Sequence, residues 1–542
     1  MVLQQIDAQF ADRLRTAVAA QIPEFLPRQR WFRSKARRIQ SAQLSDCIPV
    51  PLSQSLAVIA LTTVEFTEGG AESYVVPLIA SPPGHACRPE SVAVRLPTSE
   101  LGPDQLLIDA LADPEFLSAI FRAIVNASSF AGQCGKLHAR PESGLAESNW
   151  SLEANPPQPR LLHGEQSNSS VVFGDRFILK LFRRVEEGIH PDLEIGRFLS
   201  SVAHFENVPA VCGSLTYQSP ESSVITLGIL QRFIPNRGDA WRHTVDFLAA
   251  LFASPDHPTG EPLSGSIPSA SSAKSNAAVS EASPHFGNQL QLVRLLGTRT
   301  AELHLALASS SADPSFAPER FTPEIREGME AAFHDLIVHN FEMLRLKIAE
   351  LPEPMAALAK DILELEDDAL LARHSILEKE ISSIRIRIHG DFHLGQVLFT
   401  GSDFFITDFE GEPARPLNQR RDKRSPLQDV AGMLRSFHYA ASVASTLAKQ
   451  RRAHSPEAGA EVDAQAAEWQ SLASTEFLRS YRSVAGDAKF VPADPVEFDA
   501  LLKMFLLEKA VYELGYELNN RPVWLHIPLQ GIRDILSAPK TP

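Results

Sequence analysis

The sequence predicts an α+β protein of two lobes, one rich in β-strands and one mostly helical, with an additional α/β cap in front of them. Three patterns predict this class. Short β-rich runs joined by turn residues follow residue 160, apolar residues recur at helical spacing through most of the chain after residue 288, and a separate helix-then-strand pattern precedes both. We therefore expect a cap, a connector, a strand-rich lobe and a helical lobe, at residues 1–135, 136–159, 160–236 and 237–542.

The cap begins with apolar residues at helical spacing in residues 1–25, which predict an amphipathic helix. Three β-rich runs follow, and turn residues such as Gly69-Gly70 separate them. Helical spacing returns at the end of the cap. We expect strands at 55–66, 73–80 and 91–96 and a helix at 104–126.

The strand-rich lobe is predicted from a hairpin. Gly174-Asp175 lies between two β-rich runs, and Lys180 stands near the end of the second run. Pro191 occupies the first turn of the helix predicted next, a position that tolerates the missing N–H of proline. We expect this helix at 190–203 and two further strands at 213–218 and 222–232.

The helical lobe contains an insertion and a short strand region. Residues 254–286 are rich in Ser, Pro, Ala and Gly and have few large apolar residues, so they are predicted to be disordered. Two strand-like runs place catalytic strands within 384–408. Helices are expected at 288–308, 322–350, 354–379, 426–449, 462–484 and 495–519.

The bulk properties of the 542-residue chain exclude several classes of protein. Its formal net charge is −15, so general affinity for nucleic acid or for an anionic membrane is not expected. Its four cysteines form no Cys-x-x-Cys pair, which argues against a zinc site or a disulfide framework. The N-terminal segment lacks the apolar stretch of a signal peptide, and no window of about 18 apolar residues occurs. We expect a cytoplasmic protein that does not enter the membrane.

Two carboxylates and an amide, Asp391, Gln396 and Asp408, follow the strand-like runs. Asp391 and Gln396 have the spacing of the Asp and Asn in the catalytic loop of protein kinases, and Asp408 stands in a D-F-E where kinases have D-F-G. In phosphoryl transfer one carboxylate orients the attacking hydroxyl and accepts its proton, while an amide and a second carboxylate hold Mg²⁺ against the phosphates of ATP. The sequence therefore predicts a kinase, with Asp391 as catalytic base and Gln396 and Asp408 as metal ligands.

Lys180 and the loop before its hairpin are the candidate nucleotide-binding residues. The lysine lies in an apolar run, where its ammonium needs a polar partner, and kinases pair such a lysine with a glutamate on the next helix. Glu194 is the expected partner, with Asp192 and Glu187 as alternatives. Polar loop residues offer hydroxyl and backbone N–H donors to phosphate oxygens, and we expect this role for Ser167, Asn168 and Ser169.

Aromatic and carboxylate side chains recur at i, i+4 within residues 509–524. Tyr512 with Tyr516, and Glu513 with Glu517, form one stripe on a predicted helix. Sugar recognition favours this mixture, because sugar rings stack on aromatic faces and carboxylates accept hydrogen bonds from hydroxyls. Ordinary helix packing with solvated glutamates explains the stripe equally well, and the sequence leaves both interpretations open.

A basic cluster follows the D-F-E motif. Charge runs of this kind are usually solvated, and the alternative is that some members screen phosphate charge or order the loop that corresponds to the activation segment of kinases. The sequence assigns none of them to catalysis. The members of the cluster are Arg415, Arg420, Arg421, Lys423 and Arg424.

At these residues the chain resembles the bacterial maltokinases, which occur free or fused behind trehalose synthase. The matching segments include HGDFHLGQVLFTGSDFFITDFEGEPARPLNQRRDKRSPLQDVAGMLRSFHYAA, and the others begin WFRSK, HGEQSNSS and EKAVYELGYE. They lie at 389–441, 31–39, 163–199 and 508–532. One departure is visible in the cap motif, where Arg33-Ser34 replaces two glycines of the family pattern.

The resemblance implies a protein-kinase-like bilobal fold with an N-terminal cap subdomain, of the aminoglycoside-phosphotransferase-like superfamily. It implies transfer of the γ-phosphoryl group of ATP, with Mg²⁺, to the anomeric hydroxyl of maltose, giving maltose 1-phosphate for α-glucan and glycogen synthesis. It gives Asp391, Gln396, Asp408, Lys180 and Glu194 the roles already described. It further implies acceptor contacts from His393, Arg424, Lys509, Tyr512, Glu513, Tyr516 and Glu517.

Two other functions stay open at this point. One is a small-molecule kinase of the same fold that acts on an aminoglycoside, choline or a different sugar. The other is an inactive binding partner or domain of trehalose synthase, against which the intact Lys180, Asp391, Gln396 and Asp408 argue. The sequence does not decide whether the chain is part of a fusion, which oligomer it forms or which nucleotide it prefers.

Overall fold

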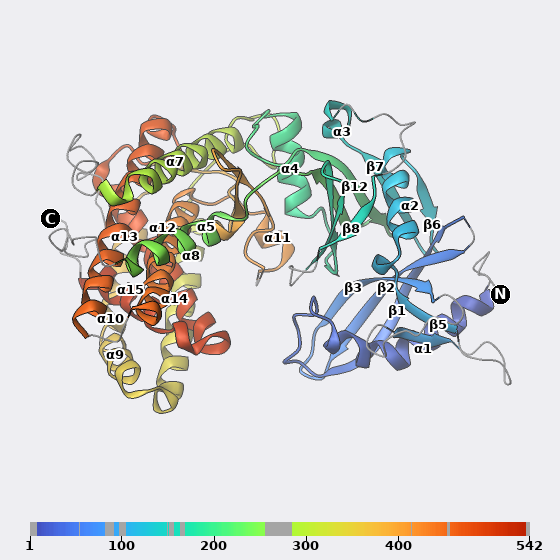
Figure 1. The fold of residues 1–542 in the computed structure, drawn as a ribbon, viewed down its shortest axis with the longest axis horizontal. Coiled ribbons are helices and arrows are strands. Elements are labelled where there is room, and N and C mark those ends of the chain that lie inside the picture. The colour runs from blue at the N-terminus through green and yellow to red at the C-terminus, as the bar shows by residue number, and fades with distance from the viewer. Residues whose placement is uncertain are drawn as a thin grey trace. The chain divides into compact units, whose positions relative to one another are not determined.

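The computed structural model divides into two compact units, Met1–Pro235 with Ala414–Arg420, and Asn236–Pro413 with Arg421–Pro542. In Figure 1 the first unit is blue to green apart from its short orange segment, and the second runs from green to red. None of the helices in the described ranges is both long enough and apolar enough to cross a bilayer. The structure describes residues 8–53, 55–81, 92–96, 105–148, 150, 157–162, 168–254, 284–413, 415–452 and 456–537.

The first sheet of unit 1 forms most of the predicted cap. Its strands have the order β1-β2-β3-β5-β4, with β11 (Arg184–Val185) paired to β3. Helix α1 (Ala8–Phe25) packs on this sheet through the apolar stripe that its sequence predicts. The strands are β1 (Ile39–Pro51), β2 (Leu56–Phe66), β3 (Ala71–Ala80), β4 (Val92–Leu96) and β5 (Gln105–Asp109).

The structure corrects the helix predicted at 104–126. Gln105–Asp109 is strand β5, which pairs with β3 and β4, and helix α2 (Pro114–Val125) begins only after Asp113. The Asp113 carboxylate accepts a hydrogen bond from Phe116 N, and Pro114 occupies the first turn, so the helix start is encoded locally. Strand β5 is not encoded locally, because its leucines fit the spacing of a helix as well as that of a strand.

A seven-stranded sheet makes up the rest of unit 1, in the order β6-β7-β12-β13-β10-β9-β8. Helix α4 (Pro191–Ser201) confirms the predicted helix after the Lys180 hairpin. The strands are β6 (Ser129–Ala131), β7 (Lys136–Pro141), β8 (Pro159–Leu161), β9 (Asn168–Phe173), β10 (Phe177–Phe182), β12 (Val211–Gln218) and β13 (Val224–Arg232).

The expected connector contains ordered elements of this sheet. Strand β7 lies between β6 and β12, and helix α3 (Ser143–Glu147) packs against β12. The two sheets also share one apolar core, in which Ile59 and Val75 of the first join Leu179 and Leu230 of the second. This continuous core explains why both sheets form a single compact unit.

Unit 2 is mostly helical and is built around α12 (Leu427–Arg451), of which 17 of 25 residues are buried. Helix α12 packs against α5, α13 and α14. The predicted helix at 354–379 is two helices, interrupted at Glu364 and Leu365. The others are α5 (Ala240–Ala253), α7 (Gly287–Leu307), α8 (Pro323–Lys347), α9 (Glu353–Leu363), α10 (Glu366–Leu377), α13 (Pro456–Ala485), α14 (Pro495–Asn520) and α15 (His526–Ser537).

Two small strand pairs interrupt the helices of unit 2. Strand β15 (Ile384–Arg385) pairs with β14 (Glu319–Arg320), and β16 (Val397–Phe399) forms a hairpin with β17 (Phe404–Ile406). The insertion predicted to be disordered at 254–286 lies outside the described residues, except for Ser254 and the short helix η5 (Pro284–Phe286). Further single turns are η1 (Leu26–Arg28), η3 (Ala110–Ala112), η6 (Ile348–Glu350), η7 (Leu394–Gln396) and η8 (Pro522–Trp524).

Candidate active site

The β16–β17 hairpin brings the two predicted metal ligands to the same end of its two strands. Gln396 directly precedes β16, Asp408 follows β17 by two residues, and Thr407 N donates to Gln396 O at 2.9 Å. Asp408 has a φ of +69°, a conformation that L-residues rarely adopt without tertiary support. Amide and carboxylate oxygens are the ligand types that Mg²⁺ prefers. The donor set therefore fits the predicted metal.

Asp391 lies in the loop between β15 and η7, beside a lysine of α14. Lys509 Nζ donates to Asp391 Oδ1 at 3.3 Å, and His393 Nε2 lies 3.9 Å from Asp391 Oδ2. Burial raises the pKa of Asp391, but the charges of Lys509 and the two nearby histidines outweigh it, and the pKa lies below its ordinary value. Asp391 is therefore ionised at neutral pH and able to accept a hydrogen bond from a substrate hydroxyl.

The same electrostatic balance keeps Lys509 charged and His393 neutral. Burial lowers the pKa of Lys509, yet the carboxylates of Asp391, Glu412 and Glu513 raise it above its ordinary value. Burial lowers the pKa of His393, and its Nδ1 accepts a hydrogen bond from Gly395 N at 3.0 Å. The ring proton of His393 therefore sits on Nε2, which faces Asp391.

A close approach of two glycines joins the Asp391 loop to the chain after Asp408. Gly390 and Gly411 have φ values of +84° and +70°, and a methyl group added at Gly390 would come within 3.2 Å of the Gly411 Cα. Both the conformation and the lack of space require glycine. The H-G-D and D-F-E-G motifs thus fix the two loops against each other.

Asp429, in the first turn of α12, holds the backbone of the Asp391 loop and was missed by the sequence analysis. Its carboxylate accepts hydrogen bonds from His389 N at 2.7 Å and Gly390 N at 2.9 Å, and it lies 3.2 Å from His304 Nε2. Asp429 is 1% exposed. A carboxylate inside an otherwise apolar helical run was the available signal, because a buried charge must have partners.

Two further residues on the same face of α12 contact this loop. Gly432 leaves room for the Phe392 carbonyl, which would lie 2.5 Å from an added methyl group, and Ser436 Oγ accepts from Leu394 N at 3.1 Å. Asp429, Gly432 and Ser436 recur at i, i+3 and i+7, the spacing of one helix face. One buried helix therefore sets the backbone position of the predicted catalytic base.

Part of the predicted acceptor stripe on α14 lies beside this loop. Tyr512 Oη donates to Glu412 at 2.6 Å, and Lys509 contacts Asp391 as described. Glu513 receives two hydrogen bonds from Arg435 of α12, at 2.9 and 2.7 Å. Helix α14 is thereby fixed against both α12 and the chain that follows the D-F-E motif.

The stripe divides at its C-terminal end. Tyr516 is 45% exposed, whereas Glu517 is 1% exposed and bonds with Arg521 and with Tyr439 Oη, at 2.8 and 3.2 Å. The carboxylate of Glu517 is therefore used inside the helical unit, and its contact with the acceptor stays a prediction. Arg521 also lies over the Tyr516 ring, 5.1 Å from its centroid.

Arg424, also predicted to contact the acceptor, is held by two backbone hydrogen bonds. Arg424 N donates to Ile386 O at 2.8 Å, and Ile386 N donates to Arg424 O at 3.0 Å. This isolated bridge lies just before the Asp391 loop. The neighbouring Lys423 of the basic cluster donates hydrogen bonds to Glu319 and to the Pro314 carbonyl, each at 2.6 Å.

The predicted nucleotide-binding residues lie in unit 1. Lys180 Nζ donates to Asp192 Oδ2 at 3.2 Å, so Asp192, ranked behind Glu194 in the sequence analysis, contacts this lysine. Asp192 is 1% exposed and lies in the first turn of α4, after the capping residue His190. Its position there places a carboxylate next to the helix N-terminus, where negative charge is favourable.

The loop residues before the hairpin are only partly described. Ser167 lies outside the described residues, while Asn168 and Ser169 begin strand β9 and are each 8% exposed. Ser169 Oγ accepts from Arg183 Nε at 2.8 Å, and Arg183 also bonds Asp109 of the cap at 2.6 Å. Ser169 therefore links the hairpin to the cap, a contact that the sequence did not predict.

Comparison with protein families identifies the cap. A family model described as the maltokinase N-terminal cap domain matches residues 25–113. These residues form a maltokinase-type cap. The match confirms the resemblance found in the sequence motifs, and the matched range extends from the end of α1 to the residue before α2.

Curated proteins similar to the chain are glucosamine kinases. The protein from Streptacidiphilus jiangxiensis is 24% identical over 380 residues, which cover 69% of this chain and 72% of that protein. The protein from Mycolicibacterium smegmatis is 26% identical over 380 residues, covering 69% and 78%. Both similarities extend well beyond the length of the cap.

Solved structures confirm the fold. Glucosamine kinase in crystal form B has a TM-score of 0.62 at 20% sequence identity, and the match covers 96% of this chain and 99% of that one. Glucosamine kinase in complex with glucosamine, ADP and inorganic phosphate gives a TM-score of 0.58 at 19% identity, with the same coverage. The predicted α+β, kinase-like bilobal fold with an N-terminal cap is confirmed.

Proposed function

We propose that the chain is an ATP-dependent sugar kinase that phosphorylates the anomeric hydroxyl of maltose and forms maltose 1-phosphate. The observation that carries the proposal is the arrangement in unit 2, where the ionised Asp391 and the chain carrying Gln396 and Asp408 are fixed by the Gly390–Gly411 approach. The kinase fold and the maltokinase-type cap support it. Synthesis of α-glucan and association with trehalose synthase remain part of the proposal.

Asp391 acts in this proposal as the base for the acceptor. Its Oδ1 is held by Lys509, so Oδ2 is left to accept the hydrogen bond of the sugar hydroxyl and then its proton. Asp429 and Ser436 fix the loop backbone, which orients the carboxylate before substrate binds.

Lys180 and the donor groups of Asn168 and Ser169 bind the phosphates in this proposal. Asp192 holds the Lys180 ammonium in place beside the β9–β10 hairpin, and Gln396 and Asp408 would hold Mg²⁺. When bound, the metal ion neutralises charge on the phosphate oxygens. Lys180 contributes a further positive charge to the nucleotide phosphates.

The acceptor would lie against α14. Tyr512 presents an aromatic ring and a hydroxyl, and its partner Glu412 offers a carboxylate oxygen to a sugar hydroxyl. Both residues lie near the Asp391 loop, because Glu412 N is 4.0 Å from a methyl group added at Gly390 and the Asp391 charge acts on Tyr512. A sugar that bonds Glu412 would therefore be close to the proposed base.

Glucosamine is the second candidate acceptor, and two observations favour it. The curated relatives over 380 residues are named glucosamine kinases, and Glu412 is a carboxylate able to pair with an ammonium group. The maltokinase-type cap favours maltose instead. Both candidates require the same Asp391 and Asp408 chemistry.

A substrate panel tests the proposal. The purified chain is incubated with ATP and Mg²⁺ and with maltose, glucosamine, glucose, choline or kanamycin, and the products are analysed by ³¹P and ¹H NMR. We expect maltose to give a phosphate coupled to the anomeric proton. A phosphate on another hydroxyl of maltose would overturn the anomeric assignment, and turnover of glucosamine but not of maltose would assign the second candidate. No phosphoryl transfer to any acceptor would overturn the kinase proposal.

A further inference from the structure

The chain after the D-F-E motif changes units twice within a few residues. Asp408 and Pro413 belong to unit 2, segment 415–420 belongs to unit 1, and the chain returns to unit 2 at Arg421. This segment contains α11 (Leu417–Arg420) and corresponds in position to the activation segment of kinases. Its attachment to unit 1 therefore bears on the loop that carries the predicted metal ligand.

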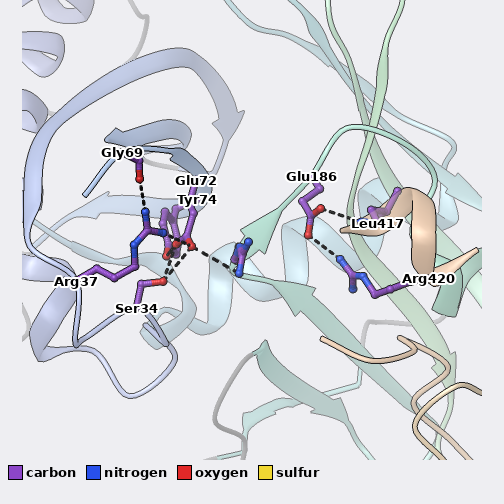
Figure 2. Close-up of polar contacts among 9 residues, drawn as sticks. Ser34, Arg37, Gly69, Glu72, Tyr74, Glu186, Leu417 and Arg420 are labelled. Carbon is purple, nitrogen blue, oxygen red and sulfur yellow. Dashed lines mark hydrogen bonds and ion pairs between the residues drawn. The ribbon is translucent and has the colours of Figure 1, made fainter. Parts of the chain in front are cut away.

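One carboxylate of unit 1 makes two polar contacts with this segment. Glu186 Oε2 accepts a hydrogen bond from Leu417 N at 3.0 Å, and Glu186 Oε1 accepts from the Arg420 guanidinium at 2.6 Å. Figure 2 shows both oxygens of Glu186 directed at segment 415–420. The Arg420 side chain is 7% exposed, so this ion pair is largely shielded from water.

The apolar part of the attachment is small. Leu417 is 5% exposed and lies against Gly188, where an added methyl group would come within 2.7 Å of Leu417 Cδ2. A cavity of about 390 Å³ opens beside it, lined in part by Glu72, Arg184 and Asn418. The segment is therefore held near β11 by Glu186 and by the packing of Leu417 on Gly188.

Glu186 itself is held by the cap. It follows β11, which pairs with β3 of the cap sheet through Arg184 and Val185. Arg184 lies 3.6 Å from Glu72 of β3, and Glu72 also accepts hydrogen bonds from Ser34 and Arg37, the cluster shown at the left of Figure 2. The strand carrying Lys180 ends only a few residues before β11.

We propose that Glu186 is a positioning residue that ties the cap to the metal-binding loop through segment 415–420. The carboxylate holds the segment on β11, and the short stretch between Asp408 and the segment transmits this restraint to the metal ligand. The inference rests on the proposed kinase function and extends it, because it gives the cap a role in phosphoryl transfer. Among the residues of the basic cluster, Arg420 is the one that this proposal uses to order the loop.

Limited trypsin digestion tests the attachment without any substrate. The Arg415-Pro416 bond resists trypsin, so cleavage after Arg420 or Arg421, mapped by mass spectrometry, reports release of the segment. We expect cleavage about fivefold faster in Glu186→Gln and Glu186→Ala than in the unmodified chain. Glu221→Gln, a change of an exposed carboxylate in the turn between β12 and β13, is the matched control and should cleave at the unmodified rate.

Steady-state kinetics test the consequence. In Glu186→Gln we expect the Mg²⁺ concentration for half-maximal rate to rise about fivefold and kcat to fall about tenfold, with KM for the sugar unchanged. Glu186→Asp should recover part of both, and Arg420→Gln combined with Glu186→Gln should be no worse than either change alone.

The outcomes separate the two proposals. Unaltered cleavage in the Glu186 variants would overturn the attachment, and faster cleavage with unaltered Mg²⁺ dependence would overturn the positioning role. If the unmodified chain phosphorylates no sugar, the proposed function falls while the digestion still decides whether Glu186 holds the segment.

Discussion

Two buried carboxylates, Asp46 in unit 1 and Asp429 in unit 2, hold loops by their backbone N–H groups. Asp46 accepts hydrogen bonds from the N–H groups of Gln133, Cys134 and Gly135, at 2.7, 3.1 and 2.8 Å, and from Tyr217 Oη at 2.7 Å. Asp429 accepts from His389 N and Gly390 N. In both sites one buried carboxylate accepts hydrogen bonds from successive backbone N–H groups of a loop.

Their consequences differ because the loops carry different residues. The loop held by Asp46 joins β6 to β7 and carries none of the proposed site residues. The loop held by Asp429 leads directly into Asp391. The comparison teaches that a buried carboxylate of this kind stabilises whatever loop it holds, and contributes to catalysis only when that loop positions a reacting group.

Loss of the proposed base should have the largest effect on the rate. Asp391→Asn should lower kcat by at least about 100-fold, because the base is lost, while the melting temperature and nucleotide binding change little. Steady-state kinetics with calorimetric nucleotide titration measures both. Near-normal turnover in this variant would show that Asp391 is not the base. The loop held by Asp429 would then not position the reacting group that the comparison assigns to it.

Asp429→Asn should lower kcat about tenfold or more, since a neutral amide leaves one loop N–H without an acceptor and lets Asp391 shift. The melting temperature should fall as well, so the rate is normalised to folded protein measured by circular dichroism. Gly432→Ala offers an independent way to displace the same loop. If both variants keep full kcat per folded molecule, α12 does not position the base.

Asp46→Asn should affect stability alone. Replacing a carboxylate that accepts several hydrogen bonds is expected to reduce the free energy of unfolding by about 2 kcal/mol, measured by urea denaturation. The kcat of the folded fraction should equal that of the unmodified chain. A drop in kcat comparable to that of Asp429→Asn would contradict the distinction between the two regions.

Lys509→Met tests the electrostatic balance at Asp391. Burial raises the pKa of Asp391 and Lys509 lowers it, so removal of the ammonium should raise the pKa. The reaction needs the carboxylate form, which is lost as pH falls through the pKa, so the acidic limb of the kcat/KM profile should move to higher pH. An unmoved limb would mean that another group controls it.

Tyr512→Phe should give the smallest effect. Loss of the hydrogen bond to Glu412 is expected to raise KM for the sugar by about three- to tenfold and to leave KM for ATP unchanged. Tyr217→Phe, which removes a tyrosine hydroxyl hydrogen bond in unit 1, serves as the control. Equal changes in both KM values would indicate that Tyr512 only packs the helix.

Local patterns in the sequence determined much of this protein. The apolar stripe of α1, the hairpin turn before Lys180 and the motif spacing of Asp391, Gln396 and Asp408 are each written within a short window. They predicted the α+β class and the residues of the proposed chemistry, because helix periodicity, turn chemistry and motif spacing depend only on neighbours in the chain.

Tertiary structure alone decided what depends on distant partners. Gln105–Asp109 became a strand because β3 and β4 pair with it, Asp192 contacts Lys180, and Glu517 turned inward to Tyr439. Asp429 and Glu186 acquired their partners from loops 39 to 234 residues away. No short window encodes such pairs, since burial and charge pairing are properties of the folded chain.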